Sequence, residues 1–415
     1  MVDTAFARCA AACAGREVLA IQDTTVTRSS GGGGSYLHAM VAVDAANGAM
    51  LGVLDAQFLE RRDGKSASRR HRAFGEKESA RWLAGAVRAG RIEGAARVCV
   101  VADREADIAA LFAQRPAHVD VLVRAMHDRA LADGGKLAAH IARGPRLGRV
   151  EHALAAVPGR AARSAALSVR FGRITLRRPT AGRAGGAVPA PHRGRKTLLR
   201  PRAARPQTGA DSLAPIALSY VDLCEETPPP GTPPVHWRLL TTLPVDSVAD
   251  AIAIGERYAR RWKIEEVFRT MKRKGFDIEA LRIKDEAPRN RLILACLVAA
   301  CIVLQMTADR DGQALRPITD AFDPEDRPFL EAVSRTLEGR TARQKNPHPP
   351  GSLAFAAWVC ARLGGWTGYY GKPGPIVILN GWIRFQTLKT GAHIASTSPH
   401  KRAAKMRESD SPWGG

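Results

Sequence analysis

Three short apolar segments separated by turn residues open the sequence, and they constrain the fold more than any other feature. They are Glu17 to Thr25, Tyr36 to Asp44 and Met50 to Glu60. A glycine run separates the first two segments, and an Asn-Gly pair separates the second from the third. Short apolar runs bounded in this way are typical of β-strands. The pattern therefore predicts three sequential antiparallel strands.

The following residues alternate between helical and strand patterns. Glu76 to Val87 has helical spacing, Ala96 to Asp103 is an apolar strand, Glu105 to Phe112 begins a helix, and Val119 to Met126 is a further strand. This order predicts an α/β protein with a mixed sheet flanked by helices. It is also the order of the ribonuclease-H-like fold, which we expect here.

The rest of the chain changes character twice. From about residue 131 to 250 the pattern is that of alternating strands, such as Ala166 to Leu176, with a stretch rich in Arg, Gly and Pro from Arg177 to Pro206. We expect that stretch to be a flexible basic loop. Helical spacing returns at Ser247 to Phe276, and Leu292 to Met306 is an apolar run that predicts a buried helix.

These patterns predict a catalytic core split by an insertion. The expected parts are a short tail at 1–15, the first part of the core at 16–130, a β-rich insertion with the basic loop at 131–250, the second part of the core at 251–310, a helical C-terminal region at 311–395, and a disordered tail at 396–415.

The charge balance points to a polyanionic partner. The chain has 63 Lys and Arg against 40 Asp and Glu, a net charge of +23. Nucleic acid is the first candidate, although a basic but inert surface has the same composition.

Other compositional features indicate the compartment. Seven cysteines without a Cys-x-x-Cys pair fit reduced thiols and support no zinc site. The apolar run at 292–306 is 15 residues long, short of the roughly 20 that a membrane span needs. We therefore expect a cytoplasmic protein that does not cross a membrane.

Two aspartates stand at the ends of predicted strands. Asp23 ends an apolar segment and is followed by two threonines, and Asp103 ends the strand at 96–103. Side chains at neighbouring strand ends converge where loops leave a sheet. Two hard cations roughly 3.5–4 Å apart, held by carboxylate oxygens, can activate a nucleophile and stabilise a leaving oxygen in phosphoryl transfer. Two divalent cations, Mg²⁺ with Mn²⁺ as a substitute, are therefore the expected cofactors.

A third carboxylate is offered by a predicted helix from Tyr258 to Lys274. Tyr258, Arg261, Glu265 and Lys272 are separated by three, four and seven residues, which places them along one helix stripe. Such a stripe can hold a metal ligand and phosphate-binding groups on the same DNA strand. A solvated helix face with a Glu-Lys ion pair has the same spacing, and this alternative stays open for each residue taken singly.

Neighbouring acids and apolar residues have simpler interpretations. We expect caps or surface charges at Glu105, Asp107 and Glu266, of which Glu266 is rotated about 100° from Glu265 on the helix. The residues expected to face the core from this helix are Trp262, Ile264, Phe268 and Met271.

Five motifs together resemble the insertion-sequence-four family of bacterial DDE transposases. They are AIQDTT, EKESARWL, VADREADI, WRLLTTLPVDS and YARRWKIEEVFRTMK, and they occur in the family's order between Val18 and Ala395. The Tyr-Arg-Glu-Lys spacing from Tyr258 to Lys272 matches the family signature and is far more specific than a single acidic residue.

The resemblance implies metal-dependent cut-and-paste transposition by a ribonuclease-H-like core. Asp23, Asp103 and Glu265 correspond to the metal-binding triad. The signature residues Tyr258, Arg261 and Lys272 correspond to groups that hold the phosphates of the transposon end.

The resemblance also assigns two further DNA contacts and a partner. Trp237 matches a tryptophan that stabilises a flipped base, and an ordinary strand aromatic remains an open alternative. Arg124 looks like a DNA contact. The segment LAFAAWVCARLGGW resembles the family's C-terminal dimerisation region, so a homodimer bound to transposon ends and target DNA is expected.

The chain departs from the family pattern before Asp23, where 22 residues stand in place of an end-recognition domain. We therefore expect a competent core with impaired sequence specificity. The alternative is a truncated, non-mobilising inhibitor that binds DNA or dimerises with a full-length relative. A general nuclease of the ribonuclease-H-like class is a third hypothesis, which the signature and the insertion disfavour.

Overall fold

The structure is a computed structural model that describes residues 1–30, 33–61, 78–154, 161–177, 215–272 and 275–397. The chain divides into two compact units. The first comprises Met1–Ser66, Ile92–Ala96 and Arg261–Gly415, and the second comprises Ala67–Arg91 and Arg97–Arg260. The predicted basic loop, from residue 178 onward, and the predicted tail, from residue 398 onward, lie outside the described residues.

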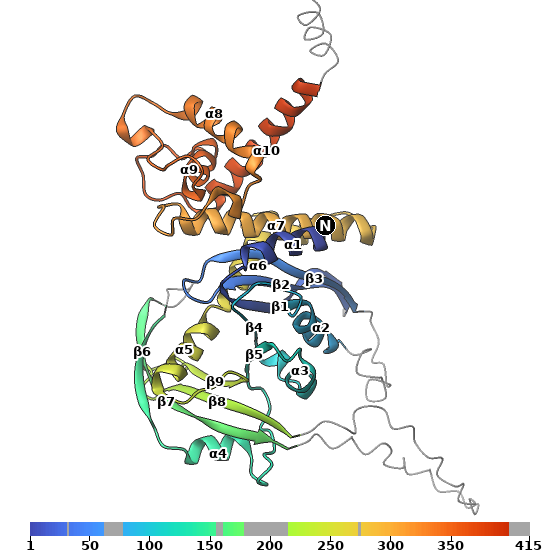
Figure 1. Ribbon diagram of the computed structural model, residues 1–415, viewed down its shortest axis with the longest axis vertical. Coiled ribbons are helices and arrows are strands. Elements are labelled where there is room, and N and C mark those ends of the chain that lie inside the picture. The colour runs from blue at the N-terminus through green and yellow to red at the C-terminus, as the bar shows by residue number, and fades with distance from the viewer. Residues whose placement is uncertain (31–32, 62–77, 155–160, 178–214, 273–274, 398–415) are drawn as a thin grey trace, which may run out of the picture. The chain divides into compact units, whose positions relative to one another are not determined.

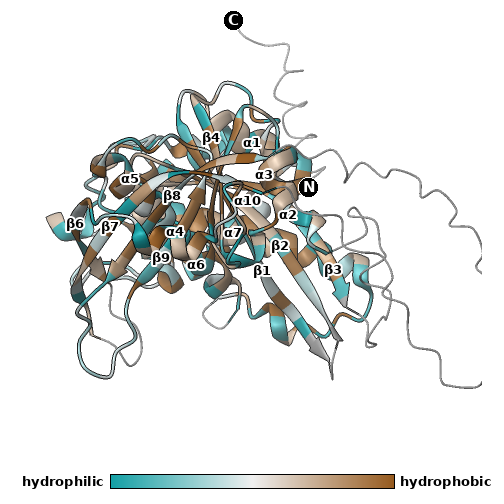
Figure 2. Ribbon diagram, turned by 90° about the horizontal axis from the view of Figure 1, so that it is seen from below, coloured by the Kyte–Doolittle hydropathy of each residue, from teal (hydrophilic) through white to brown (hydrophobic). Residues whose placement is uncertain are grey.

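The first unit contains an antiparallel sheet of three strands, in the order of the chain. They are β1 (Glu17–Ser30), β2 (Gly33–Asp44) and β3 (Met50–Arg61). Gly48 has a φ of +73° in the turn between β2 and β3, a conformation that favours glycine. Figure 2 shows bands of polar and apolar colour along these strands, the alternation that gives one sheet two different faces. The predicted antiparallel strands are confirmed.

Two helices pack against β3 in this unit, α1 (Val2–Ala12) and α7 (Glu286–Asp309), side by side in Figure 1. Among the described helices, α7 alone is long and apolar enough to cross a membrane, but 61% of its most apolar window is buried inside the protein. It contacts β3, α6 and α10. Its burial and its contacts are therefore those of a core helix. The buried helix predicted at residues 292–306 is confirmed.

Three further helices form a cluster around the end of α7. They are α8 (Arg327–Leu337), α9 (Leu353–Leu363) and α10 (Pro375–Thr397). Leu330, Leu353, Trp358 and Phe385 lie in their shared apolar core. The helical C-terminal region is thus present, while its role in dimerisation stays a prediction.

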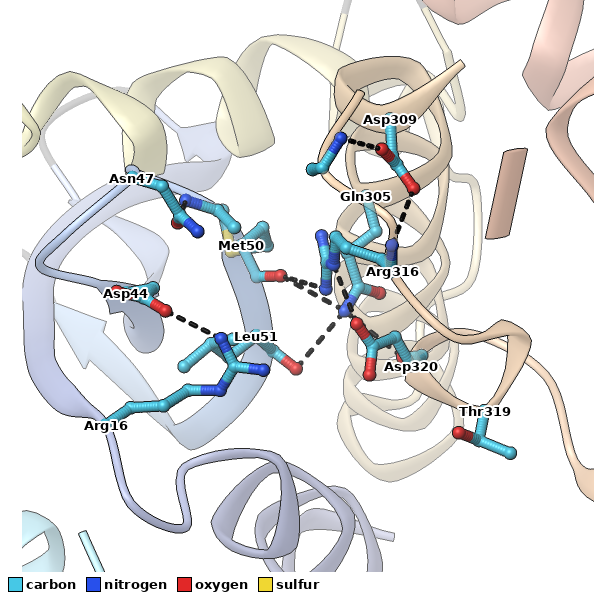
Figure 3. Close-up of polar contacts among 12 residues, drawn as sticks. Arg16, Asp44, Asn47, Met50, Leu51, Gln305, Asp309, Arg316, Thr319 and Asp320 are labelled. Carbon is cyan, nitrogen blue, oxygen red and sulfur yellow. Dashed lines mark hydrogen bonds and ion pairs between the residues drawn. The ribbon is translucent and has the colours of Figure 1, made fainter. Parts of the chain in front are cut away.

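Buried polar side chains of α7 and of the segment that leads from α7 to this helical cluster contact β3 (Figure 3). The Gln305 amide donates to the carbonyl oxygens of Met50 and Leu51 at 3.3 and 3.2 Å. The Arg316 guanidinium donates to the Met50 carbonyl at 2.8 Å and to the Asp320 carboxylate at 2.7 Å. Because buried carbonyls need donors, these contacts fix the cluster on the edge of the sheet.

The second unit is built on a mixed sheet with the strand order β4-β5-β9-β8-β7-β6. Only β4 and β5 are parallel, and the other neighbours are antiparallel. The strands are β4 (Arg97–Ala102), β5 (Val119–Arg124), β6 (Gly148–Leu154), β7 (Arg163–Leu176), β8 (Ile216–Glu225) and β9 (His236–Thr241). The mixed α/β class is confirmed, and the ribonuclease-H-like fold stays a prediction.

Four helices flank this second sheet. They are α2 (Ala80–Ala89), α3 (Ala109–Gln114), α4 (Leu137–Arg143) and α5 (Val248–Ala259). Helix α2 contacts β4 and α3, and α5 packs on β5, β7 and β8. The helix predicted to start at Glu105 begins instead as a 3₁₀ turn, η2 (Arg104–Ala106), followed by α3.

The single helix predicted from Tyr258 to Lys274 is wrong. The chain forms α5, which ends at Ala259, and α6 (Trp262–Met271). Arg260 and Arg261 between them keep right-handed helical dihedrals, so helical spacing in the sequence continues across the interruption. The core-facing prediction holds for Ile264, Phe268 and Met271, which are buried, but fails for Trp262, which is 53% exposed.

The cysteines are free, as the sequence predicted. Burial raises the pKa of Cys296 to about 11 and that of Cys301 to about 12. Both thiols therefore stay protonated at neutral pH and act as apolar core groups.

Candidate active site

Asp23 lies within a strand and not at its end. β1 continues for seven residues to Ser30, because Thr24, Thr25 and Val26 are β-branched and pair with β2. The Asp23 carboxylate accepts a hydrogen bond from the Thr24 backbone N–H at 2.7 Å. Its side chain is 24% exposed. The strand thus holds a carboxylate that solvent can reach.

One guanidinium joins Asp23 to Glu265. Arg261 Nη1 donates to Asp23 at 3.0 Å, and Arg261 Nη2 donates to Glu265 at 2.7 Å. The Arg261 side chain is only 8% exposed, which strengthens both interactions. The sequence placed Arg261 and Glu265 one helical turn apart, and the structure adds Asp23 from a distant part of the chain.

Asp103 directly follows β4 in the second unit, as predicted. Its carboxylate accepts a hydrogen bond from the Tyr258 hydroxyl at 3.1 Å. The Tyr258 side chain is buried, and α5 holds it on the sheet. A predicted metal ligand and a predicted phosphate-binding residue therefore touch within this unit.

Trp237 and Arg124 lie near the same groups. The Trp237 ring packs edge-on against Tyr258, with centroids 5.6 Å apart, and against His152 at 4.9 Å. Arg124 ends β5, which runs parallel to β4, so it lies at the same sheet edge as Asp103. Its guanidinium donates to the His236 carbonyl at 2.9 Å. Trp237 is therefore a partly exposed strand aromatic linked through Tyr258 to Asp103.

Lys272 departs from the predicted stripe. Helix α6 ends at Met271, and Lys272 has a ψ of −115°, outside the helical region. Its ammonium forms an ion pair with Glu279 at 2.8 Å. The seven-residue spacing from Glu265 consequently does not place Lys272 on a helix face.

The remaining acids have structural partners. The buried Asp107 carboxylate accepts from the backbone N–H groups of Met126 and His127 and from Arg129, so it holds the loop after β5. Glu105 pairs with Arg81 at 2.8 Å. Glu266 likewise pairs with Lys263 at 3.1 Å. None of the three is aligned as a metal ligand.

Sequence reasoning missed a polar network beside Asp23. The buried His38 ring on β2 contacts the Gln22 amide oxygen at 3.0 Å and the Thr24 hydroxyl at 2.9 Å. Gln22 and Thr24 flank Asp23, so this ring fixes the strand on both sides of the carboxylate. The alternation of polar residues within an apolar strand was the available signal. His152 was also missed; burial lowers its pKa, so its ring is mostly neutral at pH 7.

The donor set suits hard divalent cations. Among the described residues, no group of three or more His, Cys, Asp or Glu side chains is arranged as a ready metal cluster. Asp23 and Glu265 nevertheless contact the two ends of one guanidinium, so a positive charge of the protein itself occupies the space between them. Carboxylate oxygens in such an arrangement are the ligands that Mg²⁺ prefers.

Comparison with known families shows what the chain is similar to. Residues 15–302 match a family model described as "Transposase DDE domain". The match includes every predicted site residue in both units.

Proposed function

The chain belongs to the transposase DDE domain family, and from this premise we propose that it cleaves and rejoins DNA with Asp23, Asp103 and Glu265 as ligands of two divalent cations. The family acts on DNA as strand-cleaving and strand-transferring enzymes. Mg²⁺ is the expected ion, and Mn²⁺ substitutes for it. When bound, the cations activate the attacking oxygen and stabilise the leaving oxygen.

The observation that carries the proposal is the contact of Asp23 and Glu265 with one buried arginine, which lies 238 residues from Asp23 in the sequence. Two carboxylates repel each other unless a cation lies between them. A fold that holds both carboxylates around the positive charge of an arginine side chain is suited to bind metal ions in place of that side chain.

The protein's own groups have separate tasks in this proposal. Arg261, Tyr258 and Lys272 hold the phosphates of the DNA end, and Arg124 adds a further contact. Trp237 stacks on a flipped base, supported by its partial exposure and its packing on Tyr258. The finer assignment is a cytoplasmic transposase of the insertion-sequence-four type with a ribonuclease-H-like core, which acts by cut-and-paste as a homodimer on transposon ends and target DNA.

Metal-dependent nicking of a supercoiled plasmid tests the proposal. The native protein should nick in Mg²⁺ or Mn²⁺, and Asp23→Asn, Asp103→Asn and Glu265→Gln should each lower the rate by on the order of 10²-fold or more. Glu105→Gln is the matched control, because Glu105 lies two residues from Asp103 and pairs with Arg81. Nicking by Asp103→Asn at the native rate would overturn the proposal, as would no nicking by the native protein in either ion.

A further inference from the structure

A basic pocket in the first unit lies beyond the groups described above. Its lining residues are Val26, Arg28, Glu279, Leu281, Arg282 and Lys284. Its volume of about 580 Å³ falls in the range of ligand-binding clefts, roughly 300–1,000 Å³. We propose that this pocket binds phosphates of the DNA backbone at a distance from the reacting strand position. The inference rests on the proposed function.

The charges of the pocket are unbalanced. Arg28, Arg282 and Lys284 are exposed, and none of their side chains has a hydrogen bond or ion pair to another residue in the described part of the chain. Glu279 is the only acid in the lining, and its carboxylate is paired with Lys272 at 2.8 Å. Three cations in one pocket repel each other, and a polyanion relieves that repulsion.

Local backbone structure builds the pocket. The pairing of β1 with β2 shifts between Val26 and Arg28, so Thr27 and Arg28 together oppose Ser35. Such a bulge redirects a side chain, here that of Arg28. On the other wall, the buried Ile278 anchors the turn η4 (Ile278–Ala280), which packs on β1 and leads into Arg282 and Lys284.

Distance along β1 relates the pocket to Asp23. Val26 and Arg28 are three and five residues beyond Asp23, which is about 10–17 Å along an extended strand. At about 3.4 Å per base pair, this corresponds to roughly three to five base pairs of duplex. Arg and Lys bind phosphates without reading bases, so the pocket contributes position and affinity but no sequence preference.

The dependence of duplex binding on salt tests the pocket. Arg282→Ala/Lys284→Ala should reduce the slope of log K against log salt by nearly two units, because each lost phosphate contact removes about 0.9. Arg340→Ala/Lys345→Ala removes the same charges from exposed positions of the same unit outside the pocket, and it should leave the slope unchanged. Arg28→Ala should reduce the slope by about one unit.

Equal changes in the salt slope for Arg282→Ala/Lys284→Ala and for the control, or no change in either slope, would overturn the inference. All substituted side chains are exposed, so thermal melting should show native stability. Failure of the pocket is distinguishable from failure of the proposed function. An unchanged slope with nicking that still requires Asp103 rejects the pocket alone, whereas nicking by Asp103→Asn at the native rate rejects the proposed function.

Neutral methylphosphonate linkages distinguish phosphates of the transposon end from phosphates of the target DNA as ligands of the pocket. They are introduced singly into a pre-cut transposon-end duplex or into a target duplex of arbitrary sequence. A linkage three to five positions from the reacting phosphate should weaken binding by the native protein but not by Arg282→Ala/Lys284→Ala. Interference in the end duplex assigns the pocket to the transposon end, and interference in the target duplex assigns it to target DNA. Interference in neither overturns the inference.

Discussion

Arg261 joins Asp23 and Glu265, because its guanidinium contacts both carboxylates. Under the proposed function the two carboxylates bind metal ions, so the guanidinium would compete with the ions for them. The same proposal gives Arg261 a contact with DNA phosphate, so that one arginine would have two roles.

Arg261→Gln should therefore lower the stability of the protein without metal and enlarge the stabilisation that added metal gives. Without metal, the variant should lose about 1–3 kcal/mol of unfolding free energy, because two charge-assisted hydrogen bonds are removed. Its increase in melting temperature on addition of Mg²⁺ should exceed that of the native protein, because the ion no longer competes with a guanidinium. Thermal unfolding and titration calorimetry measure both effects.

Arg269→Gln is the control for that measurement, since Arg269 is exposed on the same helix. It should leave the Mg²⁺-induced shift at the native value. An Mg²⁺-induced increase in the melting temperature of Arg261→Gln that equals or falls below the native increase would contradict competition between Arg261 and the ion.

At this scale the sequence predicts residue types better than contacts. Asp103 could be selected because it follows an apolar strand, and Glu265 because of its helix spacing, whereas the strand end that selected Asp23 was wrong, since β1 continues to Ser30. The sharing of Arg261 by Asp23 and Glu265 could not, because it depends on tertiary packing across 238 residues. The pairing of Lys272 with Glu279 was missed because it needs the end of α6 at Met271.

Helix α5 presents Tyr258 to Asp103, so the start of that helix affects the candidate site. Ser247 and Asp250 form a capping box, in which the Ser247 hydroxyl accepts from the Asp250 N–H and the Asp250 carboxylate accepts from the Ser247 N–H. Hydrogen bonding from the Ser247 side chain is the main reason that the pKa of Asp250 is lowered from its ordinary 3.8. A lowered pKa means that this stabilisation is present above pH 3.8 and is lost as pH falls through the folded-state value.

Ser247→Ala should destabilise α5 by about 1 kcal/mol at neutral pH, and the difference from the native protein should narrow at pH values below about 4. Amide exchange across residues 248–259 measures the change. Ser352→Ala is the matched control, because the Ser352 hydroxyl caps α9 without an acidic partner. Ser352→Ala should destabilise α9 by a similar free energy, and this loss should be independent of pH in this range. A pH-independent difference in α5 would contradict the role of Asp250.

Strands were easier to predict than helix ends. Short apolar runs identified β1, β2, β3, β4 and β5, and turn residues bounded the first three. The interruption between α5 and α6 left no sequence signal, since Arg260 and Arg261 are ordinary helix-forming residues with helical dihedrals. The helix α1 was also missed, because the first residues were expected to form a tail.

For the whole molecule, the predicted site residues divide between the two compact units. Asp23, Arg261 and Glu265 belong to the first unit, and Asp103, Tyr258 and Trp237 belong to the second. The boundary falls between Arg260 and Arg261, within the signature itself. A sequence pattern records the order of these residues, whereas their contacts within each unit depend on tertiary packing that the pattern does not contain.

Assembly on two DNA ends is the remaining property of the whole molecule that can be tested. Ile376 and Ile383 on α10 are 46% and 45% exposed and lie seven residues apart, on one side of the helix. The proposed function has the protein act as a homodimer on two ends, so a second copy is the expected occupant of this apolar face. Ile376→Asp/Ile383→Asp should weaken dimerisation by on the order of 10²-fold in sedimentation velocity, because two apolar contacts become buried charges.

If one copy suffices for nicking and two copies are needed to hold paired ends, the same variant should still nick plasmid DNA but fail to join paired ends. Val87→Asp is the control, because Val87 is 43% exposed on α2 and lies outside the C-terminal cluster. It should dimerise and join normally. Native dimerisation by Ile376→Asp/Ile383→Asp would place the interface elsewhere, whereas loss of both nicking and joining with unchanged melting would show that the α10 face serves the catalytic step itself.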